Sequence, residues 1–178
     1  MSTLSVDTIQ GKTTAGTVAM PSGTIIQARY SSSTTRVSGT TNGADVTLMT
    51  ADAFTPKFAN SKIIITMSLY FGAWNPNGGL QVVRSISGGS TTYGIGDTGE
   101  TFNNGQGFFI ADDLVVTSYQ YAMSHFGGTV EDTTHNTTSE ITYSLRATSV
   151  GSVYFNQPKT SPNNGHGRSS ITLMEVAQ

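Results

Sequence analysis

The sequence predicts an all-β protein built as an antiparallel, jelly-roll-like β-sandwich. Runs rich in β-branched and aromatic residues are separated by Gly, Asn or Ser clusters about every ten residues, the spacing of short strands and turns. The longest runs alternate between apolar and polar residues, as half-buried strands do. The chain has 178 residues, enough for one hydrophobic core and an appendage.

The clearest predicted strand is KIIITMSLYFG, residues 62–72. Side chains alternate between the two faces of a strand. One face carries Ile63, Ile65, Met67, Leu69 and Phe71, and the other carries Ile64, Thr66, Ser68 and Tyr70. We expect the first face to lie in the core, while the second is only half polar.

A second strong strand is SEITYSLRA, residues 139–147. Its inward positions are Ile141, Tyr143, Leu145 and Ala147, and its outward positions are Thr142, Ser144 and Arg146. This alternation is cleaner than in the first strand, so its outer face is expected to meet water.

The closing run SSITLMEV, residues 169–176, has apolar side chains on both faces. Ile171 and Leu173 lie on one face, and Met174 and Val176 lie on the other. An exposed edge strand this apolar would promote aggregation. The run is therefore predicted to be central in its sheet or to lie at a subunit interface.

Seven further runs complete a two-sheet sandwich. They are Thr24–Tyr30, Asp45–Met49, Leu80–Ile86, Thr91–Ile95, Gly107–Val116, Ser118–Phe126 and Gly151–Phe155.

The first 22 residues differ from the rest of the chain. Leu4 and Val6 alternate with polar residues, whereas residues 10–22 show no periodic pattern and are typical of a linker. We therefore divide the chain into an extended arm and linker, residues 1–22, and a β head, residues 23–178.

The composition excludes several classes of function. Charged residues make up 11% of the chain and the net charge is -2, so no basic face is available to bind nucleic acid. The sequence shows neither an apolar run of membrane-spanning length nor a signal-peptide pattern. It contains no cysteine, so stability must come from packing or from association between subunits.

No motif argues for an enzyme, a metal or a cofactor. GIGDTG, residues 94–99, matches a dinucleotide-binding pattern in letters, but no helix pattern follows it, so it is interpreted as a turn-rich loop. His125, His135 and His166 lack the spacing of metal ligands. Asp112 and Asp113 are adjacent, so in a strand they would point to opposite faces and could not act as a pair.

Several of these pieces together resemble small fibre-type or tail-associated structural proteins of tailed bacteriophages, especially phages of marine bacteria. The resemblance rests on MSTLSVDTIQ, SKIIITMSLYFG, VVRSISGG running into GIGD, NTTSEITYSLRA, VGSVYFN and SSITLMEV. It spans nearly the whole chain. It implies a virion protein with a docking arm and a head similar to the trimeric jelly rolls of the tumour-necrosis-factor type.

The resemblance also implies partners for each part of the chain. Leu4, Val6 and Ile9 are expected to anchor the arm to a sheet edge or groove of another virion protein, on the capsid, neck or tail. The alternative for this segment is a disordered tail. If the head is a homotrimer, strands 62–72 and 169–176 are expected near the threefold axis. The predicted interface residues are Ile65, Met67, Leu69, Leu173 and Met174.

Two other functions remain as alternatives. In the first, the head binds a host-surface glycan or receptor through Trp74, Tyr93 and Phe102 on Gly- and Asn-rich loops. The alternative interpretation of Trp74 is that its side chain folds back and caps the hydrophobic core. The second alternative, a polysaccharide-degrading enzyme, is disfavoured because the chain shows neither internal repeats nor paired carboxylates on one strand face.

Overall fold

The computed structural model describes residues 21–40, 46–74, 78–96, 101–102, 105–106, 109–111, 123–148, 152–160 and 165–178. Its regular elements in these ranges are all β-strands. They are β1 (Ile25–Ser33), β2 (Val37–Thr40), β3 (Val46–Thr50), β4 (Lys62–Trp74), β5 (Gly78–Ile86), β6 (Thr91–Thr92), β7 (Thr101–Phe102), β8 (Gly105–Gln106), β9 (Phe109–Ala111), β10 (Ser124–Asp132), β11 (Ile141–Thr148), β12 (Ser152–Phe155) and β13 (Ser169–Val176).

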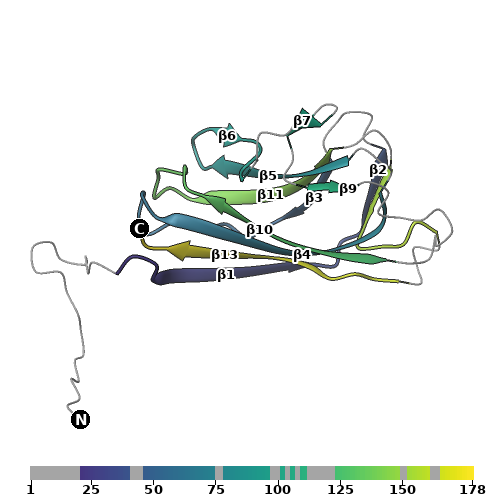
Figure 1. The fold of residues 1–178 in the computed structure, drawn as a ribbon, viewed down its shortest axis with the longest axis horizontal. Helices are drawn as coiled ribbons and strands as arrows, with labels where there is room; N and C mark the ends of the chain where they lie inside the picture. The colour runs from purple at the N-terminus through teal and green to yellow at the C-terminus, as the bar shows by residue number, and fades with distance from the viewer. Residues whose placement is uncertain are drawn as a thin grey trace, which may run out of the picture.

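The strands form two antiparallel sheets that pack face to face (Figure 1). In the first sheet, β13 lies between β1 and β4, and β10 pairs along the opposite edge of β4. At the far end of β4, β12 and β2 continue this sheet. The second sheet has the order β3-β11-β5, with β6 and β9 pairing on β5, and β7 and β8 form a small separate hairpin.

The chain crosses between the sheets in jelly-roll order. It passes from β3 to β4, from β4 to β5, and from β10 to β11, changing sheet each time. The first and last long strands, β1 and β13, are neighbours in one sheet. Two such sheets joined by Greek-key crossings define a jelly roll, so the predicted fold class is confirmed.

The core lies between the inner faces of the two sheets. Ile63, Ile65, Met67, Leu69 and Phe71 of β4 all point inward and are at most 2% exposed. The inward side chains of β11, from Ile141 to Ala147, are equally buried. Both predicted alternations are therefore confirmed, and β13 is central in its sheet as expected.

Burial corrects most of the predicted trimer interface. The side chains of Ile65, Met67, Leu69 and Leu173 are at most 2% exposed within a single chain. They already pack against the opposite sheet, so they have no surface to offer another subunit. Met174 points the other way and remains half-exposed.

Strand boundaries differ from expectation mainly around residues 107–132. The expected strand Ser118–Phe126 is β10, which runs from Ser124 to Asp132 and includes Gly127 and Gly128. Of the expected strand Gly107–Val116, the structure describes only β9. The short strand β2 was not expected. The predicted arm lies outside the described residues except for its last two positions.

Candidate interaction surface

The outer face of the first sheet is a broad surface made of regular rows of side chains. Register aligns the outward residues of β10, β4, β13 and β1 in that order. The three rows are Glu131, Ile64, Met174 and Ala28; then Thr129, Thr66, Thr172 and Tyr30; then Gly127, Ser68, Ser170 and Ser32. The residues at the sheet edges are exposed, and those on β4 and β13 are half-buried. We call this surface the hydroxyl face.

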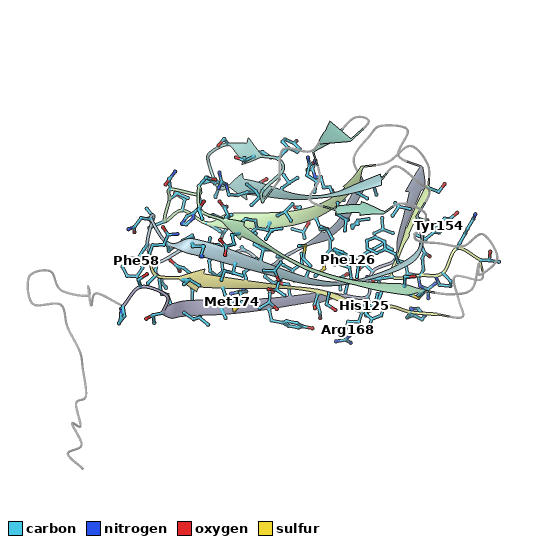
Figure 2. The ribbon with its side chains drawn as sticks, in the orientation of Figure 1. Phe58, His125, Phe126, Tyr154, Arg168 and Met174 are labelled. Atoms are coloured by element: carbon cyan, nitrogen blue, oxygen red, sulfur yellow. The ribbon has the colours of Figure 1, made fainter. Side chains whose placement is uncertain are left out.

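Charge on the hydroxyl face is confined to its two ends. At one end the Lys62 ammonium lies 3.1 Å from a Glu131 carboxylate oxygen. At the other end, His125 accepts or donates a 2.8 Å hydrogen bond with Ser68 Oγ, and its ring lies 4.9 Å from the Tyr70 ring. Figure 2 labels His125 beside the exposed Arg168 at this second end, with Met174 towards the first.

The outer face of the second sheet is covered over part of β5. Val83 and Gln81 of β5 point outward, because they pair with the outward residues Ser144 and Arg146, yet they are only 1% and 5% exposed. In Figure 1, β6 lies beside β5 as the next strand of the same sheet. The hydroxyl face, in contrast, has half-buried or exposed outward side chains on all four of its strands.

The three predicted receptor contacts are described only in part. Tyr93 is 49% exposed, and the Arg146 guanidinium lies 5.4 Å from its ring centroid. Trp74 is the last residue of β4, where it pairs with Val153, and Phe102 belongs to β7. The side chains of Trp74 and Phe102 lie outside the described residues, as do the predicted docking residues Leu4, Val6 and Ile9.

The sandwich encloses an ionic cluster that sequence analysis missed. Arg84 Nη1 donates to both carboxylate oxygens of Asp132, at 2.7 and 2.8 Å. Tyr143 donates its hydroxyl to the same carboxylate at 2.8 Å, and the Thr134 backbone N–H donates at 2.9 Å. Because Arg84 and Tyr143 belong to the second sheet and Asp132 to the first, the cluster joins the two sheets.

The protonation states of this cluster follow from its contacts. Burial raises the pKa of Asp132, but the hydrogen bonds from Thr134, Arg84 and Tyr143, with the Arg84 charge, outweigh it and hold the pKa below its ordinary value. Burial, together with the Asp132 charge, raises the pKa of Tyr143 well above its ordinary value. The cluster is a buried ion pair with a neutral phenol, an arrangement typical of a structural role.

A second buried carboxylate holds the loop before β4. Glu175 is fully buried and accepts hydrogen bonds from the backbone N–H groups of Lys57 and Phe58, both at 2.9 Å. Ser61 Oγ and Gln27 Nε2 donate to it at 2.7 and 2.6 Å. Burial alone raises the pKa of Glu175, but these donors lower it below its ordinary value.

The alternation of the sequence carries a signal for the Arg84 and Asp132 cluster. Arg84 shares an inward face with Val82 and Ile86, and Asp132 shares one with Val130. A charged residue at an inward position needs a buried partner of opposite charge. Two such residues on different strands could therefore have been paired from the sequence.

Ser68 and His125 are side chains of the types used in nucleophilic catalysis. Ser68 and His125 are within hydrogen-bond distance, but they lie on an open sheet face whose backbone N–H groups serve the strand ladders. Among the described residues there is no group of three side chains suited to binding a metal ion. Nor does this part of the chain contain a helix long and apolar enough to cross a bilayer.

Comparison with known proteins gives only distant structural neighbours. No family model and no curated protein matches the chain. The structure is similar to the VP2 subviral particle of infectious bursal disease virus, with a TM-score of 0.38 at 10% identity over 97% of this chain and 42% of that one. It is also similar to the Gx strain structure of that virus, with a TM-score of 0.36, 10% identity and coverage of 100% and 42%. For the Gt strain structure the TM-score is 0.35 at 12% identity, with coverage of 97% and 41%.

This chain therefore spans about two fifths of the length of those neighbours. The jelly-roll assignment rests on the strand connectivity of this chain itself.

Proposed function

We propose that this chain is a non-enzymatic structural protein of a bacteriophage virion, of the short fibre, knob or decoration type. In this proposal the arm anchors the chain to another virion protein, and a trimeric β head projects from the particle. The sequence resemblance to fibre-type and tail-associated phage proteins supports the virion role. The jelly-roll head supports a role in assembly or display.

The observation that carries the proposal is the contrast between the interior and the surface. The buried ionisable groups Asp132, Glu175 and Arg84 are all used in hydrogen bonds that hold strands and loops together. The hydroxyl face, in contrast, is broad and open, and its charged side chains lie at its two ends. Such a molecule is suited to contacts between surfaces rather than to chemistry on a small substrate.

The test of the arm is rebinding of the full chain to purified particles that lack it. The variant with Leu4→Asp, Val6→Asp and Ile9→Asp should lose rebinding, because these apolar side chains are the proposed anchors. A matched control carries Thr3→Asp, Ser5→Asp and Thr8→Asp, which adds the same charge at neighbouring positions. The control should rebind like the unmodified chain.

Three results would count against the proposal. Equal rebinding of both variants would locate attachment on the sandwich rather than on the arm. Loss of rebinding in both would show that charge alone, and not the apolar anchors, controls attachment. Absence of the chain from the mass spectrum of purified particles would contradict the virion role itself.

A second candidate function is binding of a host-surface glycan, which the exposed Tyr93 ring supports. Aromatic rings stack on sugars, and the neighbouring Arg146 provides a cation beside the ring. Tyr93→Ala should abolish binding on a glycan array. Tyr30→Ala removes a more exposed tyrosine, at 61% against 49% for Tyr93, from the hydroxyl face and serves as the control. Glycan binding through Tyr93 would be ruled out if the Tyr93→Ala variant still bound, or if the unmodified chain bound no glycan. The structural role would then remain as the proposed function.

A further inference from the structure

β1 is an edge strand, and its outer edge pairs with no other strand in the part of the chain that the structure describes (Figure 1). It is nine residues long and pairs with β13 along its inner edge. Exposed edges of this kind can pair with another strand, and proteins commonly protect them with proline, lysine or a bulge. β1 contains neither proline nor lysine, and its bulge lies at its start, between Ile25 and Gln27. The rest of the edge is open to a further strand.

The described residues beside this edge contact β1 through its side chains. The Asp52 N–H donates to Ser31 Oγ at 2.8 Å, and Gln27 Nε2 donates to the Thr55 carbonyl at 2.8 Å. The Arg29 guanidinium lies 3.9 Å from the Asp52 carboxylate. These contacts hold the side of β1 that faces away from the hydroxyl face. They leave the backbone of the edge available for pairing.

Large exposed apolar side chains gather on β1. Of the four in the described part of the chain, Ile25 and Tyr30 belong to this strand and are 57% and 61% exposed. Ala28 is exposed beside Tyr30 on the hydroxyl face, and Met174, its partner on β13, is half-exposed. A strand added to this edge places every second side chain next to these residues. It would therefore cover apolar surface that the described sandwich leaves exposed.

We propose that residues 3–9 of the same chain, which we call the arm strand, dock on the free edge of β1 as an additional antiparallel strand before the chain meets a particle. The register places Val6 opposite Tyr30 and Leu4 opposite Ser32, on the hydroxyl face. Attachment to a particle then releases the arm strand from β1. The proposal goes beyond the function proposed above, because it concerns the free chain.

The alternation of the arm strand matches the apolar surface beside this edge. In an extended strand, Leu4 and Val6 lie on one side, and the polar Ser5 and Asp7 lie on the other. Val6 opposite Tyr30 pairs a β-branched side chain with an aromatic ring, which is a favourable cross-strand pair. The apolar side of the arm strand therefore covers the apolar surface of the edge.

The polar side of the arm strand fits the other side of β1. In this register Asp7 lies opposite Arg29, whose side chain is 53% exposed even though it contacts Asp52. A shift by one residue would exchange the two sides of the arm strand. Val6 would then lie opposite Arg29, and the apolar surface on the hydroxyl face would stay uncovered. The alternation therefore selects which side of the arm strand faces outward.

The covalent connection favours the arm strand of the same chain as the occupant. Residues 1–20 lie outside the described residues and lead directly into β1. In the antiparallel arrangement Ile9 lies near the start of β1, so residues 10–24 only have to turn back. A connection of this length holds two segments together at an effective concentration of about millimolar. A strand from another molecule would need a comparable concentration to compete.

The first experiment measures amide hydrogen exchange in the free full chain by NMR. Alternate amides of an edge strand point away from its partner, so in β1 this set is protected only if another strand pairs there. We expect all amides in residues 26–32 to be protected. The variant with Leu4→Asp and Val6→Asp should accelerate exchange of the edge-directed set about tenfold or more. The set bonded to β13 should be unchanged.

The matched control carries Thr13→Asp and Thr14→Asp, which adds the same charge outside the arm strand. It should exchange like the unmodified chain. If the edge-directed amides of the unmodified chain exchange as fast as those of the variant with Leu4→Asp and Val6→Asp, the edge is uncovered and the proposal is wrong. Equal acceleration in both variants would show an effect of charge alone and would also overturn it.

A pair of introduced cysteines tests the register and the source of the strand. The chain contains no cysteine, so any disulfide joins the introduced residues. Val6→Cys with Tyr30→Cys places both thiols on the same side of paired strands and should give an intramolecular disulfide on mild oxidation. Val6→Cys with Arg29→Cys places them on opposite sides and should not. Mass spectrometry and a gel without reductant detect the products.

The remaining outcomes overturn the proposal. A disulfide in the second pair, or in neither pair, rules out the register. Disulfide-linked dimers of the first pair would show that the arm of another copy docks on β1. All these measurements use the free chain, so their failure is distinct from failure of the rebinding experiment that tests the role in the virion.

Discussion

The carboxylate of Asp132 connects three strands from two sheets through one side chain. It pairs with Arg84 of β5 and accepts the hydroxyl of Tyr143 of β11. Asp132→Asn would leave the buried Arg84 cation without a counter-ion, so we expect the free energy of unfolding to fall by about 3–5 kcal/mol. Urea denaturation measures this change.

The control for Asp132→Asn is Asp52→Asn. Asp52 is exposed and its carboxylate lies 3.9 Å from Arg29, so its loss should change the free energy of unfolding by less than about 1 kcal/mol. If the two variants had equal stability, the buried cluster would contribute nothing beyond a surface ion pair.

The lowered pKa values of Asp132 and Glu175 predict how stability depends on pH. Each carboxyl binds a proton more weakly in the folded chain than in the unfolded chain. The stability that they contribute is therefore complete above the ordinary pKa values of 3.8 and 4.5, and is lost as the pH falls through and below them. Urea midpoints should be constant near neutral pH and should decrease below about pH 5.

Asp132→Asn separates this effect from general acid unfolding. As the pH is lowered, the free energy of unfolding should decrease less steeply for the variant than for the unmodified chain. The reason is that only Glu175 remains of the two carboxyls whose protonation is coupled to unfolding. If the free energy of unfolding decreased equally with falling pH in the two chains, protonation of Asp132 would not contribute to acid unfolding.

At the scale of elements, Glu175 attaches the loop before β4 to β13, the last strand of the chain. Glu175→Gln replaces a carboxylate, which only accepts hydrogen bonds, with an amide that must turn one donor towards the N–H groups of Lys57 and Phe58. Hydrogen bonds to charged groups contribute about 1.5–3 kcal/mol. Amide exchange at these two residues should therefore accelerate by about ten- to hundredfold, as hydrogen-exchange mass spectrometry or NMR would show.

The exchange of Gly167 provides an internal reference. Its N–H donates to the Asn156 carbonyl at 3.2 Å, in a loop that Glu175 does not contact. Uniform acceleration at Gly167 and at Lys57 would mean that the substitution weakens the whole fold instead of the loop.

The faces of the long strands could be predicted from the sequence, because the two-residue period separates side chains without reference to a partner. What covers each face could not, and Met67 and Leu69 are accordingly predicted both in the core and at a subunit interface. In β4 the more apolar face, with Met67 and Leu69, is covered by the second sheet of the same chain, and Thr66 and Ser68 face outward. Periodicity gives two faces but does not tell which surface covers each one. The interface residues predicted on β4 therefore lie on the face that the second sheet of the same chain covers.

Local composition also explains the displaced strand β10. Gly127 and Gly128 have weak strand propensity, and the charged Glu131 and Asp132 resemble a turn. Backbone pairing with β4 from Phe71 to Ile63 stabilises this segment as a strand, although its own strand propensity is weak. Tertiary pairing thus extends the strand through residues that favour loops.

At the scale of the whole molecule, closure of the fold joins distant parts of the chain. The first strand pairs with the last, and the Arg84, Asp132 and Tyr143 cluster couples the two sheets. Neither sheet buries its inner face without the other, so we expect one cooperative unfolding transition. Far-UV circular dichroism follows all strands, whereas the emission of Trp74, the single tryptophan, reports on one end of β4. Their urea curves should coincide, and Asp132→Asn should shift both equally. An emission change at lower urea would show that this end of the sandwich opens independently.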